Sequence, residues 1–510
     1  MLSKQQFHTS FYFLATLVLA AALPLSHFLM GLVCFLIFLN WIAEWNWSEK
    51  LSKIRENRQF LLFSAFYVVY AIGLFKATDF NAASKEMLSK ITFLMAPIII
   101  ISSEKFNKRQ IICILTVFVL ATLFGCIWNI GYTLTHEISD YREMSRFIDH
   151  IRFSLCVVMS IVFSVYCAFE NKKDHLSPFA LYLTAALLLF LYLLFSQTLS
   201  GIVIIAVLFV CFFVYILIKS ENRKLKLSLS AVFVVIGALF LGGVIMIVND
   251  YYNAKDSSPD YNAKTAAGRS YSFSDNSMIE NGYHIDYYVC EEELAKAWNT
   301  RSDSSYEAVS TTLIRYLNSL GMRKDSSSVM ALSDENVRNV ENKCANVVYA
   351  RRFGIRKALY QTFFGVDLYR KHSVYTESSL LQRFELWRNS WELIRENPLL
   401  GVGIGNQRAA LDQRLEDNNS PIANVRKNRG SHNQFLTFWI AAGIIPLLYF
   451  VFILAYPFVC MPRQINFVYF ALILTLFISM LVEDTLNAQT GRMLYTIFAP
   501  LLLFSNINKQ

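Results

Sequence analysis

Long apolar runs separated by short polar loops make up most of the chain, and one long polar region interrupts them. The runs cover about residues 11–23, 28–45, 60–75, 88–101, 111–132, 153–169, 178–195, 201–218, 227–248, 435–460, 465–481 and 493–504. A helix needs about 20 mainly apolar residues to cross the hydrocarbon core of a bilayer. The pattern therefore predicts an all-α integral membrane protein with about 12 transmembrane helices and one large, mainly helical region between helices 9 and 10.

The first run has an alternative interpretation. It ends in Ala20-Ala21-Ala22, which resembles the small-residue cleavage site of a secretory signal peptide. A second apolar run follows at once, however, from Phe28. This continuation favours two helices joined by a tight turn at Pro24 to Ser26 over a cleaved leader.

The composition agrees with a membrane protein. Of the 510 residues, 55% are hydrophobic and 17% charged, and the mean hydropathy is +0.38. A net charge of +9 raises the question of a nucleic-acid partner. Much of this charge lies in short loops between apolar runs, where lysine and arginine set the orientation of membrane helices. We therefore expect no nucleic-acid partner.

The loop charges also predict the orientation. The termini and the loops on their side hold sixteen lysines and arginines, whereas the short loops of the other side hold six. The positive-inside rule then places both termini in the cytoplasm and the long polar region outside. The chain divides into transmembrane helices 1–9 (1–248), an extracytoplasmic region (249–433) and transmembrane helices 10–12 (434–510).

The extracytoplasmic region is too long to be an ordinary loop, so we expect it to have a structure of its own. Its pattern predicts short helices at 290–298 and 311–322, and a helix that begins near Ser333 and continues toward Arg356. Cys290 and Cys344 leave two outcomes open, a disulfide if the region is extracytoplasmic or free thiols. The other seven cysteines lie in apolar runs and are expected to be packing residues. With no catalytic motif in it, this region is interpreted as a lid or docking surface.

The candidate chemistry gathers in residues 382–443, which begin QRFELWRNSWELIRENPLLGVGIGN and end SHNQFLTFWIAAG. A helix is expected over 379–397. Ser378 or Ser379 can cap its start, and Asn397-Pro398 ends it, because the residue before a proline is pushed out of helical geometry.

An apolar stripe runs along this expected helix and should be buried. The residues at helical spacing are Leu380, Phe384, Trp387, Trp391 and Ile394. Arg383 and Arg388 flank the stripe on opposite edges, so each can extend toward a charged ligand while the stripe stays packed.

Three glycines and a His-Asn pair follow this helix. Gly401, Gly403 and Gly405 predict a tight turn, possibly with amides facing a phosphate. No strand precedes them, which argues against a dinucleotide site. His432 and Asn433 stand immediately before an apolar run, after a segment whose cations would attract an anionic lipid carrier. Those cations are Arg426, Lys427 and Arg429.

Taken together, these motifs resemble the O-antigen ligase and O-antigen polymerase superfamily. The resemblance rests on Arg383 four residues before Trp387, on Pro-Leu-Leu-Gly-Val-Gly, and on His432-Asn433 at the start of a transmembrane helix. The motifs cover about the last quarter of the chain, and the number of predicted helices extends the resemblance to most of it. Members of this superfamily are bacterial inner-membrane enzymes that take glycans from undecaprenyl pyrophosphate on the outer side of that membrane.

The resemblance implies roles for two residues. Arg383 matches the arginine that binds the pyrophosphate of the carrier, and a planar guanidinium suits bidentate bonds to phosphate. His432 matches the residue that takes a proton from the acceptor, and an imidazole with its ordinary pKa of about 6.5 can do so near neutrality. The bland alternatives are an exposed helix arginine and a histidine that caps a helix.

Other candidates are weaker. Arg152 stands at the outer start of a transmembrane helix, where the family has an arginine, although snorkelling to the interface is the ordinary explanation. The turn at 196–201, SQTLSG, lacks the arginine that the family often has, so Arg146 or Arg152 would supply that phosphate contact. Arg388 and Asn433 are proposed to bind substrate, Asn433 by capping or orienting. Glu483 and Asp484 are candidates for orienting His432 or a sugar.

The resulting hypothesis is an inverting glycosyl transfer without a metal or other cofactor, because no Asp-x-Asp or histidine cluster with ligand spacing occurs. The acceptor would be a lipid A–core sugar for a ligase or the growing glycan for a polymerase. A protein O-oligosaccharyltransferase is a third possibility within the superfamily. From another class, a membrane transporter fits twelve spans, but its apolar runs would be expected to carry ionisable residues near mid-membrane.

Overall fold

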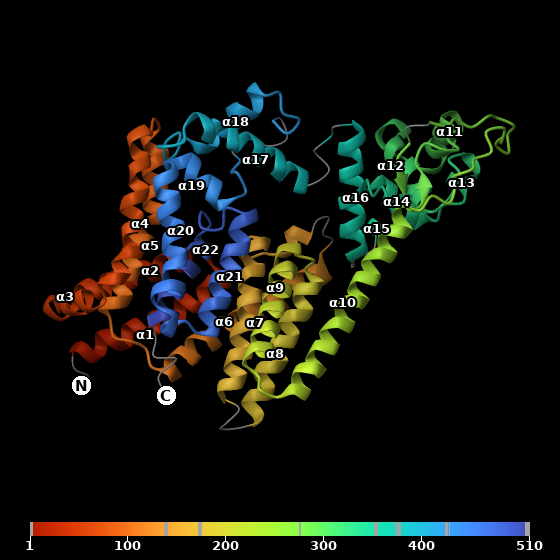
Figure 1. Cartoon of the computed structure of the whole chain (residues 1–510). Helices are drawn as coiled ribbons and strands as arrows, with labels where there is room; N and C mark the ends of the chain where they lie inside the picture. The colour runs from red at the N-terminus through yellow and green to blue at the C-terminus, as the bar shows by residue number, and fades with distance from the viewer. Residues whose placement is uncertain are drawn as a thin grey trace. The chain divides into compact units, whose positions relative to one another are not determined.

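The computed structural model describes residues 4–136, 141–171, 176–274, 277–350, 355–372, 374, 379–423, 427 and 429–504. These residues form two compact units, one of 1–214 and 383–510 and one of 215–382. Both are mainly helical, as the sequence predicts, and the second also contains two short strands (Figure 1). Helix α9 (Leu199–Lys219) and helix α17 (Ser379–Glu396) each cross a boundary between the units.

The first unit is a bundle of apolar helices. Its elements are α1 (Lys4–Leu25), α2 (His27–Ala43), α3 (Trp47–Glu56), η1 (Arg58–Phe60), α4 (Leu61–Tyr70), η2 (Ala71–Lys76), α5 (Phe80–Ser102), α6 (Lys108–Thr135), η3 (Tyr141–Met144), α7 (His150–Asn171), α8 (Leu176–Phe195), α18 (Gln407–Asp417), α19 (Gln434–Ala442), α20 (Ile444–Cys460), η4 (Pro462–Gln464), α21 (Phe467–Val482), α22 (Gln489–Met493), η5 (Leu494–Phe498) and α23 (Ala499–Phe504). Helix α1 packs against α2 and α6, and α7 packs against α6, α8 and α21. One hydrophobic core runs through these helices.

Seven helices in the described residues are long and apolar enough to cross a membrane, and eight if α2 and α3, bent by 110°, form one broken span. The chain is therefore a multi-pass membrane protein, and the count of 12 stays a prediction. The remaining predicted spans are interrupted or short. Helix α5 carries Lys85, Glu86 and Lys90, Gly443 separates α19 from α20, and α21 has 16 residues. The predicted turn between the first two helices is confirmed, because Ser26 caps α2 by accepting a hydrogen bond from the Leu29 amide.

The second unit combines the long helix α10 with a small helical domain. Its elements are α10 (Arg223–Tyr252), β1 (Ile279–Glu280), β2 (Tyr283–His284), α11 (Glu291–Arg301), α12 (Tyr306–Ser319), α13 (Ser326–Met330), α14 (Asp334–Glu341), α15 (Val347–Ala350) and α16 (Ile355–His372). The two strands pair antiparallel, with Ile279 opposite His284. Trp298 and Tyr316 lie fully buried in its core.

The helices predicted for this unit are present, with two corrections. Ser333 caps α14 as expected, but this helix ends at Glu341 and does not continue toward Arg356. The Lys343 residue after it has φ of 58°, a left-handed conformation that breaks a helix. Cys290 and Cys344 are both free thiols in the structure, so the open question of a disulfide is answered against it there.

Candidate active site

Helix α17 begins at Ser379 and ends at Glu396, within one residue of the prediction. Ser378 lies outside the described residues. The expectation that its apolar stripe is buried is wrong for Leu380, Phe384 and Trp391, which are 41%, 50% and 42% exposed, but it holds for Ile394, which is 2% exposed.

The buried face of α17 mixes polar residues with leucines, and its members are Leu381, Glu385, Leu386, Asn389, Ser390 and Leu393. There the Glu385 carboxylate accepts hydrogen bonds from Arg388 (2.7 Å), from Asn389 and from the Ser420 hydroxyl (2.8 Å). These bonds satisfy a buried carboxylate that water cannot reach, and they fix which face of the helix points inward. The aromatic stripe is left for an apolar environment outside the protein chain.

The glycine turn after α17 is confirmed, and its geometry explains the glycines. Gly401 and Gly403 have φ of 67° and 102°, and a Cβ on Gly401 would lie 2.3 Å from the Ile440 carbonyl oxygen. The Val402 amide donates to that same oxygen (2.7 Å), and the Ile404 amide donates to the Gly73 carbonyl (3.1 Å). These amides are therefore used in packing the turn against α19 and η2 and do not face a phosphate.

The His-Asn pair forms the entrance to α19. Asn433 caps the helix, because its side chain accepts hydrogen bonds from the Phe435 (3.0 Å) and Leu436 (3.1 Å) amides. Its amide group also donates to the Leu481 carbonyl (3.0 Å) at the end of α21. His432 precedes this cap with φ of 50°, a left-handed conformation that residues other than glycine seldom adopt.

Glu483, directly after α21, is the centre of the site. Its Oε1 accepts a hydrogen bond from Arg383 Nη2 at 2.6 Å, and its Oε2 lies 3.4 Å from Arg152 Nη1 and 3.2 Å from His432 Nδ1. One carboxylate thus joins three of the residues that the sequence proposed. It also supplies the predicted contact with His432.

Packing brings these four residues together. Helix α21 packs against both α7 and α19, so the end of α21 meets the start of each. Asp149 caps α7 through the Ile151 amide (3.0 Å) and lies 3.7 Å from Arg152 Nη1. Asp149 was not among the residues proposed from the sequence, although the letters DHIR place a residue that can cap a helix three positions before the arginine.

The electrostatics of the cluster are dominated by the buried carboxylate. The Glu483 side chain is 4% exposed. Burial favours its protonated form, but the hydrogen bond from His432 and the charges of Arg152 and Arg383 outweigh burial and lower the pKa of Glu483 to about 2.

An ionised carboxylate only accepts hydrogen bonds. His432 Nδ1 therefore donates to Glu483, which leaves Nε2 as the ring nitrogen able to accept a proton. With 40% of its side chain exposed, His432 is open to a bound hydroxyl group.

The other proposed residues do not join the cluster. Arg388 pairs with Glu385 on its own helix and is 57% exposed. Arg146 places its guanidinium over the Tyr132 ring, 4.5 Å from the ring centre. Asp484 accepts a hydrogen bond from Thr437 (2.6 Å), so Glu483 and not Asp484 contacts His432. Arg426 lies outside the described residues.

The turn at 196–201 contacts the start of α7. Thr198 and His150 share a hydrogen bond of 2.8 Å, and a Cβ on Gly201 would meet Leu193 at 2.7 Å. This turn therefore packs against the start of α7, the helix that carries Arg152. The arginine that the family often has here is replaced by Gly201, which suits this close contact.

An open groove of about 640 Å³ begins beside the His-Asn pair. Its lining includes Asn433, Arg388 and three tryptophans, Trp387, Trp391 and Trp439. Trp391 and Trp439 meet edge to face, 5.5 Å between ring centres. The groove is thus apolar with a polar end. Among the described residues, no group of three or more His, Cys, Asp or Glu side chains is arranged to hold a metal ion.

Comparison with known families gives one match. Residues 343–451 match the family model described as O-antigen ligase. This range includes Arg383, the glycine turn and His432, whereas Arg152 and Glu483 lie outside it. No curated protein matches the chain. The resemblance to the O-antigen ligase superfamily is confirmed over the matched residues.

Proposed function

We propose that this protein is an O-antigen ligase-like glycosyltransferase. It moves a glycan from undecaprenyl pyrophosphate to an acceptor hydroxyl of a lipid A–core sugar, at the periplasmic face of the bacterial inner membrane. The observation that carries the proposal is the Glu483 cluster. It joins Arg383, Arg152 and His432, which come from three separate parts of the sequence, through one buried carboxylate.

The two arginines are suited to hold the donor. Each guanidinium has five N–H donors, so it can bond to Glu483 and still donate to a pyrophosphate. Arg152 Nε is buried and has no partner among the described residues, which leaves at least one donor for a ligand. Two cations fixed at the leaving group stabilise the negative charge that grows there as the bond to the sugar breaks.

His432 supplies the proton acceptor. The acceptor hydroxyl gives its proton to Nε2 while its oxygen forms a bond to the anomeric carbon. The bond from that carbon to the pyrophosphate oxygen breaks, and its electron pair leaves on the pyrophosphate. A single displacement of this kind inverts the anomeric centre. It requires no metal, because the arginines carry the charge compensation.

The groove beside the site suits the lipid part of the donor. Its tryptophan lining and the exposed aromatic stripe of α17 are typical of protein surfaces at the membrane interface. A polyprenyl chain lying there would keep its pyrophosphate within reach of Arg383. The second unit remains, as a proposal, a lid or a docking surface for the acceptor.

The proposal depends on an extracytoplasmic site, which the loop charges favour. We expect a periplasm-active reporter fused within 256–274 to be active, and one fused after Lys226 to report the cytoplasm. A reporter that is active only in the cytoplasm within 256–274 would contradict the orientation and with it this function, since the carrier-linked glycan is on the other side.

A transporter remains the alternative from another class, and one observation bears on it. Helix α5 holds a buried ion pair, in which Lys90 Nζ lies 2.9 Å from Glu86 Oε1. Glu86 also accepts hydrogen bonds from Tyr70 and Gln407. Because Lys90 and Glu86 compensate each other's charge, the pair can hold α5 against its neighbours and does not require an ion pathway.

The product of the reaction is tested in a deletion strain. Loss of a ligase leaves lipid A–core without long glycan, while polymerised glycan accumulates on undecaprenyl pyrophosphate. Loss of a polymerase instead leaves single repeat units on lipid A–core, and loss of a protein glycosyltransferase changes glycoproteins only. We expect the first pattern on gels of extracted lipopolysaccharide. Unchanged glycans of every kind would refute a glycosyltransferase and favour the transporter.

A further inference from the structure

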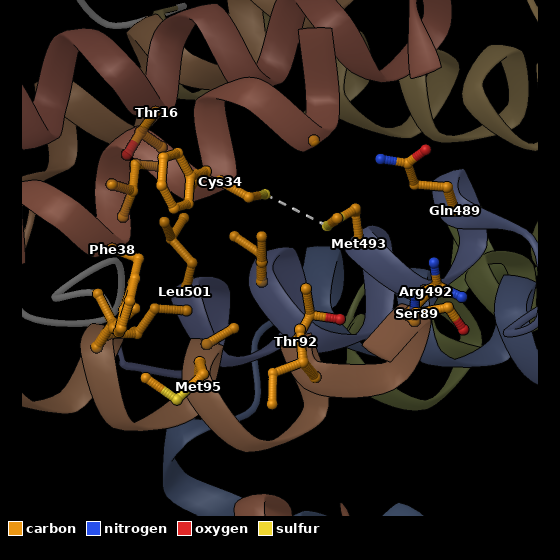
Figure 2. Close-up of a pocket in the computed structure, with 18 of the residues that line it drawn as sticks. Thr16, Cys34, Phe38, Ser89, Thr92, Met95, Gln489, Arg492, Met493 and Leu501 are labelled. Carbon is orange, nitrogen blue, oxygen red and sulfur yellow. Dashed lines mark hydrogen bonds between the residues drawn. The ribbon is translucent and has the colours of Figure 1, made fainter. Parts of the chain in front are cut away.

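A second cavity lies inside the first unit, and none of the four residues of the Glu483 cluster lines it. It has a volume of about 610 Å³ and is enclosed by α1, α2, α5 and the segment α22–α23. Most of its lining is apolar, including Phe38, Met95 and Leu501 (Figure 2). This volume is within the usual range for a site that takes one small ligand or one hydrocarbon chain.

One end of the cavity is polar. Figure 2 shows Ser89, Gln489 and Arg492 at the end opposite Phe38 and Leu501. Arg492 is only 6% exposed. Its Nη1 donates to the Leu486 (3.3 Å) and Asn487 (3.1 Å) carbonyls, whereas its Nε is buried without a partner among the described residues.

Arg492 differs from the other buried cations of this unit in having no counter-ion. Lys50 lies 2.9 Å from Glu44, and Lys90 lies 2.9 Å from Glu86. Within the described part of the chain, no carboxylate lies within 4.0 Å of the Arg492 guanidinium. Burying a charge without an opposite charge is costly, so buried cations in proteins are normally paired. The missing anion is therefore expected from outside the chain.

The cavity is accessible from the bilayer. Leu88 and Phe35 line it and are 71% and 56% exposed, so its wall is continuous with the apolar outer surface. Arg492 lies near the start of the last apolar segment, ten residues after α21 ends at Val482. The polar end of the cavity therefore lies near the end of an apolar segment. The phosphate of a membrane lipid likewise lies at the end of its hydrocarbon chains.

We propose that this cavity binds one acyl chain of an anionic phospholipid, with the lipid phosphate paired to Arg492. The chain fills the apolar end, and the phosphate supplies the counter-charge and accepts a hydrogen bond from Nε. Charge selects an anionic over a zwitterionic headgroup. The volume suits one hydrocarbon chain, which favours an ordinary membrane lipid over the long prenyl carrier.

The test is native mass spectrometry of the full chain, purified in detergent and mixed with dioleoyl phosphatidylglycerol or dioleoyl phosphatidylcholine. These lipids have the same chains and differ in headgroup charge. Both phosphates can pair with Arg492, but the choline cation of phosphatidylcholine opposes the guanidinium. We therefore expect one phosphatidylglycerol to be retained about tenfold more strongly than phosphatidylcholine, which corresponds to about 1.4 kcal/mol. Equal retention of the two lipids would overturn the proposal.

Two variants test whether the lipid binds in this cavity. Gly31 lines it, and a Cβ there meets only Gln489 Nε2 at an ordinary 3.6 Å, so the backbone accepts a side chain and Gly31→Leu should occupy part of the space. It should abolish the preferential retention. Gly131→Leu is the matched control on α6, where a Cβ meets nothing within 4 Å, and it should behave as the wild type. Retention by Gly31→Leu equal to that of Gly131→Leu would refute this site.

Arg492→Leu should remove the preference for phosphatidylglycerol. Because Arg492 also holds the Leu486 and Asn487 carbonyls, this variant can fail to fold, and Gly31→Leu then decides alone. Addition of undecaprenyl phosphate distinguishes the lipid source. We expect it not to displace phosphatidylglycerol at equal concentration. Displacement would assign the cavity to the prenyl carrier and overturn the choice of a phospholipid.

Discussion

Replacing His432 with alanine should lower glycan transfer by about 10²–10⁴-fold, the usual loss when a general base is removed. The reason is the position of the ring. Glu483 fixes Nδ1 as a donor, so Nε2 is the proton acceptor in the proposed mechanism. The measurement is transfer of carrier-linked glycan to lipid A–core by membranes that contain equal amounts of each variant.

Two further variants separate chemistry from folding. His432→Asn suits the left-handed backbone at this position, because asparagine adopts it more readily than most residues. It should keep the folded protein and lose transfer as alanine does. His136→Ala alters an exposed histidine at the end of α6 and should leave transfer unchanged. A stable His432→Asn protein with ordinary activity would exclude His432 as the base.

The second large effect is expected for Glu483→Gln. Glutamine keeps the shape of the side chain but removes the charge that Arg152, Arg383 and His432 share. Glutamine has one acceptor oxygen in place of two, so Arg383 and His432, which use different oxygens of Glu483, cannot both keep their bonds as they are. We expect transfer to fall by about 10²-fold or more, within the range for loss of general acid–base catalysis. Arg383→Lys should also lose activity, because an ammonium lacks the bidentate fork.

Glu483→Gln should also change how the stability of the protein depends on pH. The folded-state pKa of Glu483, about 2, is below the ordinary value of 4.5, so its contribution is fully present above pH 4.5 and is lost as the pH falls toward 2. The shift corresponds to roughly 3 kcal/mol at 1.36 kcal/mol per pKa unit. The difference in stability between wild type and Glu483→Gln should therefore be constant from pH 8 to 5 and shrink below pH 4.5. Thermal melting in detergent measures it.

Glu385→Gln is the matched control for this experiment. Glu385 is also a buried carboxylate paired with an arginine, but it lies on the side of α17 away from the Glu483 cluster. It should lower stability while the protein that remains folded keeps its transfer activity. If Glu385→Gln and Glu483→Gln reduce transfer equally per folded molecule, Glu483 has a structural role only.

Much of the site was predictable because its residues stand beside strong local signals. Pro398 ends α17, Gly401 and Gly403 form the turn, and His432 precedes a helix cap, all within one stretch of sequence. Arg152 was identified in the same way, as a cation at the start of an apolar helix. These signals depend only on neighbouring residues, so the sequence carries them.

The rest depends on contacts between distant segments. Glu483 lies 100 residues from Arg383 and 331 from Arg152, so its central place follows from the packing of α21 against α7 and α19. The exposure of Leu380, Phe384 and Trp391 on α17 was missed for a related reason. Helical spacing identifies an apolar stripe, but whether protein or lipid covers it depends on the rest of the structure. Here the face that carries Glu385 is buried because Ser420 and other donors satisfy Glu385.

Because of the left-handed backbone at His432, selection for a stable protein and selection for glycan transfer should favour different residues at this position. Residues other than glycine are uncommon at φ of 50°, although histidine adopts it more often than most, and holding one there costs about 1–3 kcal/mol. In a library with all residues at position 432, glycine and asparagine would therefore be the most abundant survivors of a screen for protein level. A screen for surface glycan would discard both and keep histidine. Substitutions at position 432 that would make the protein more stable are therefore expected to be selected against for as long as the cell needs the glycan.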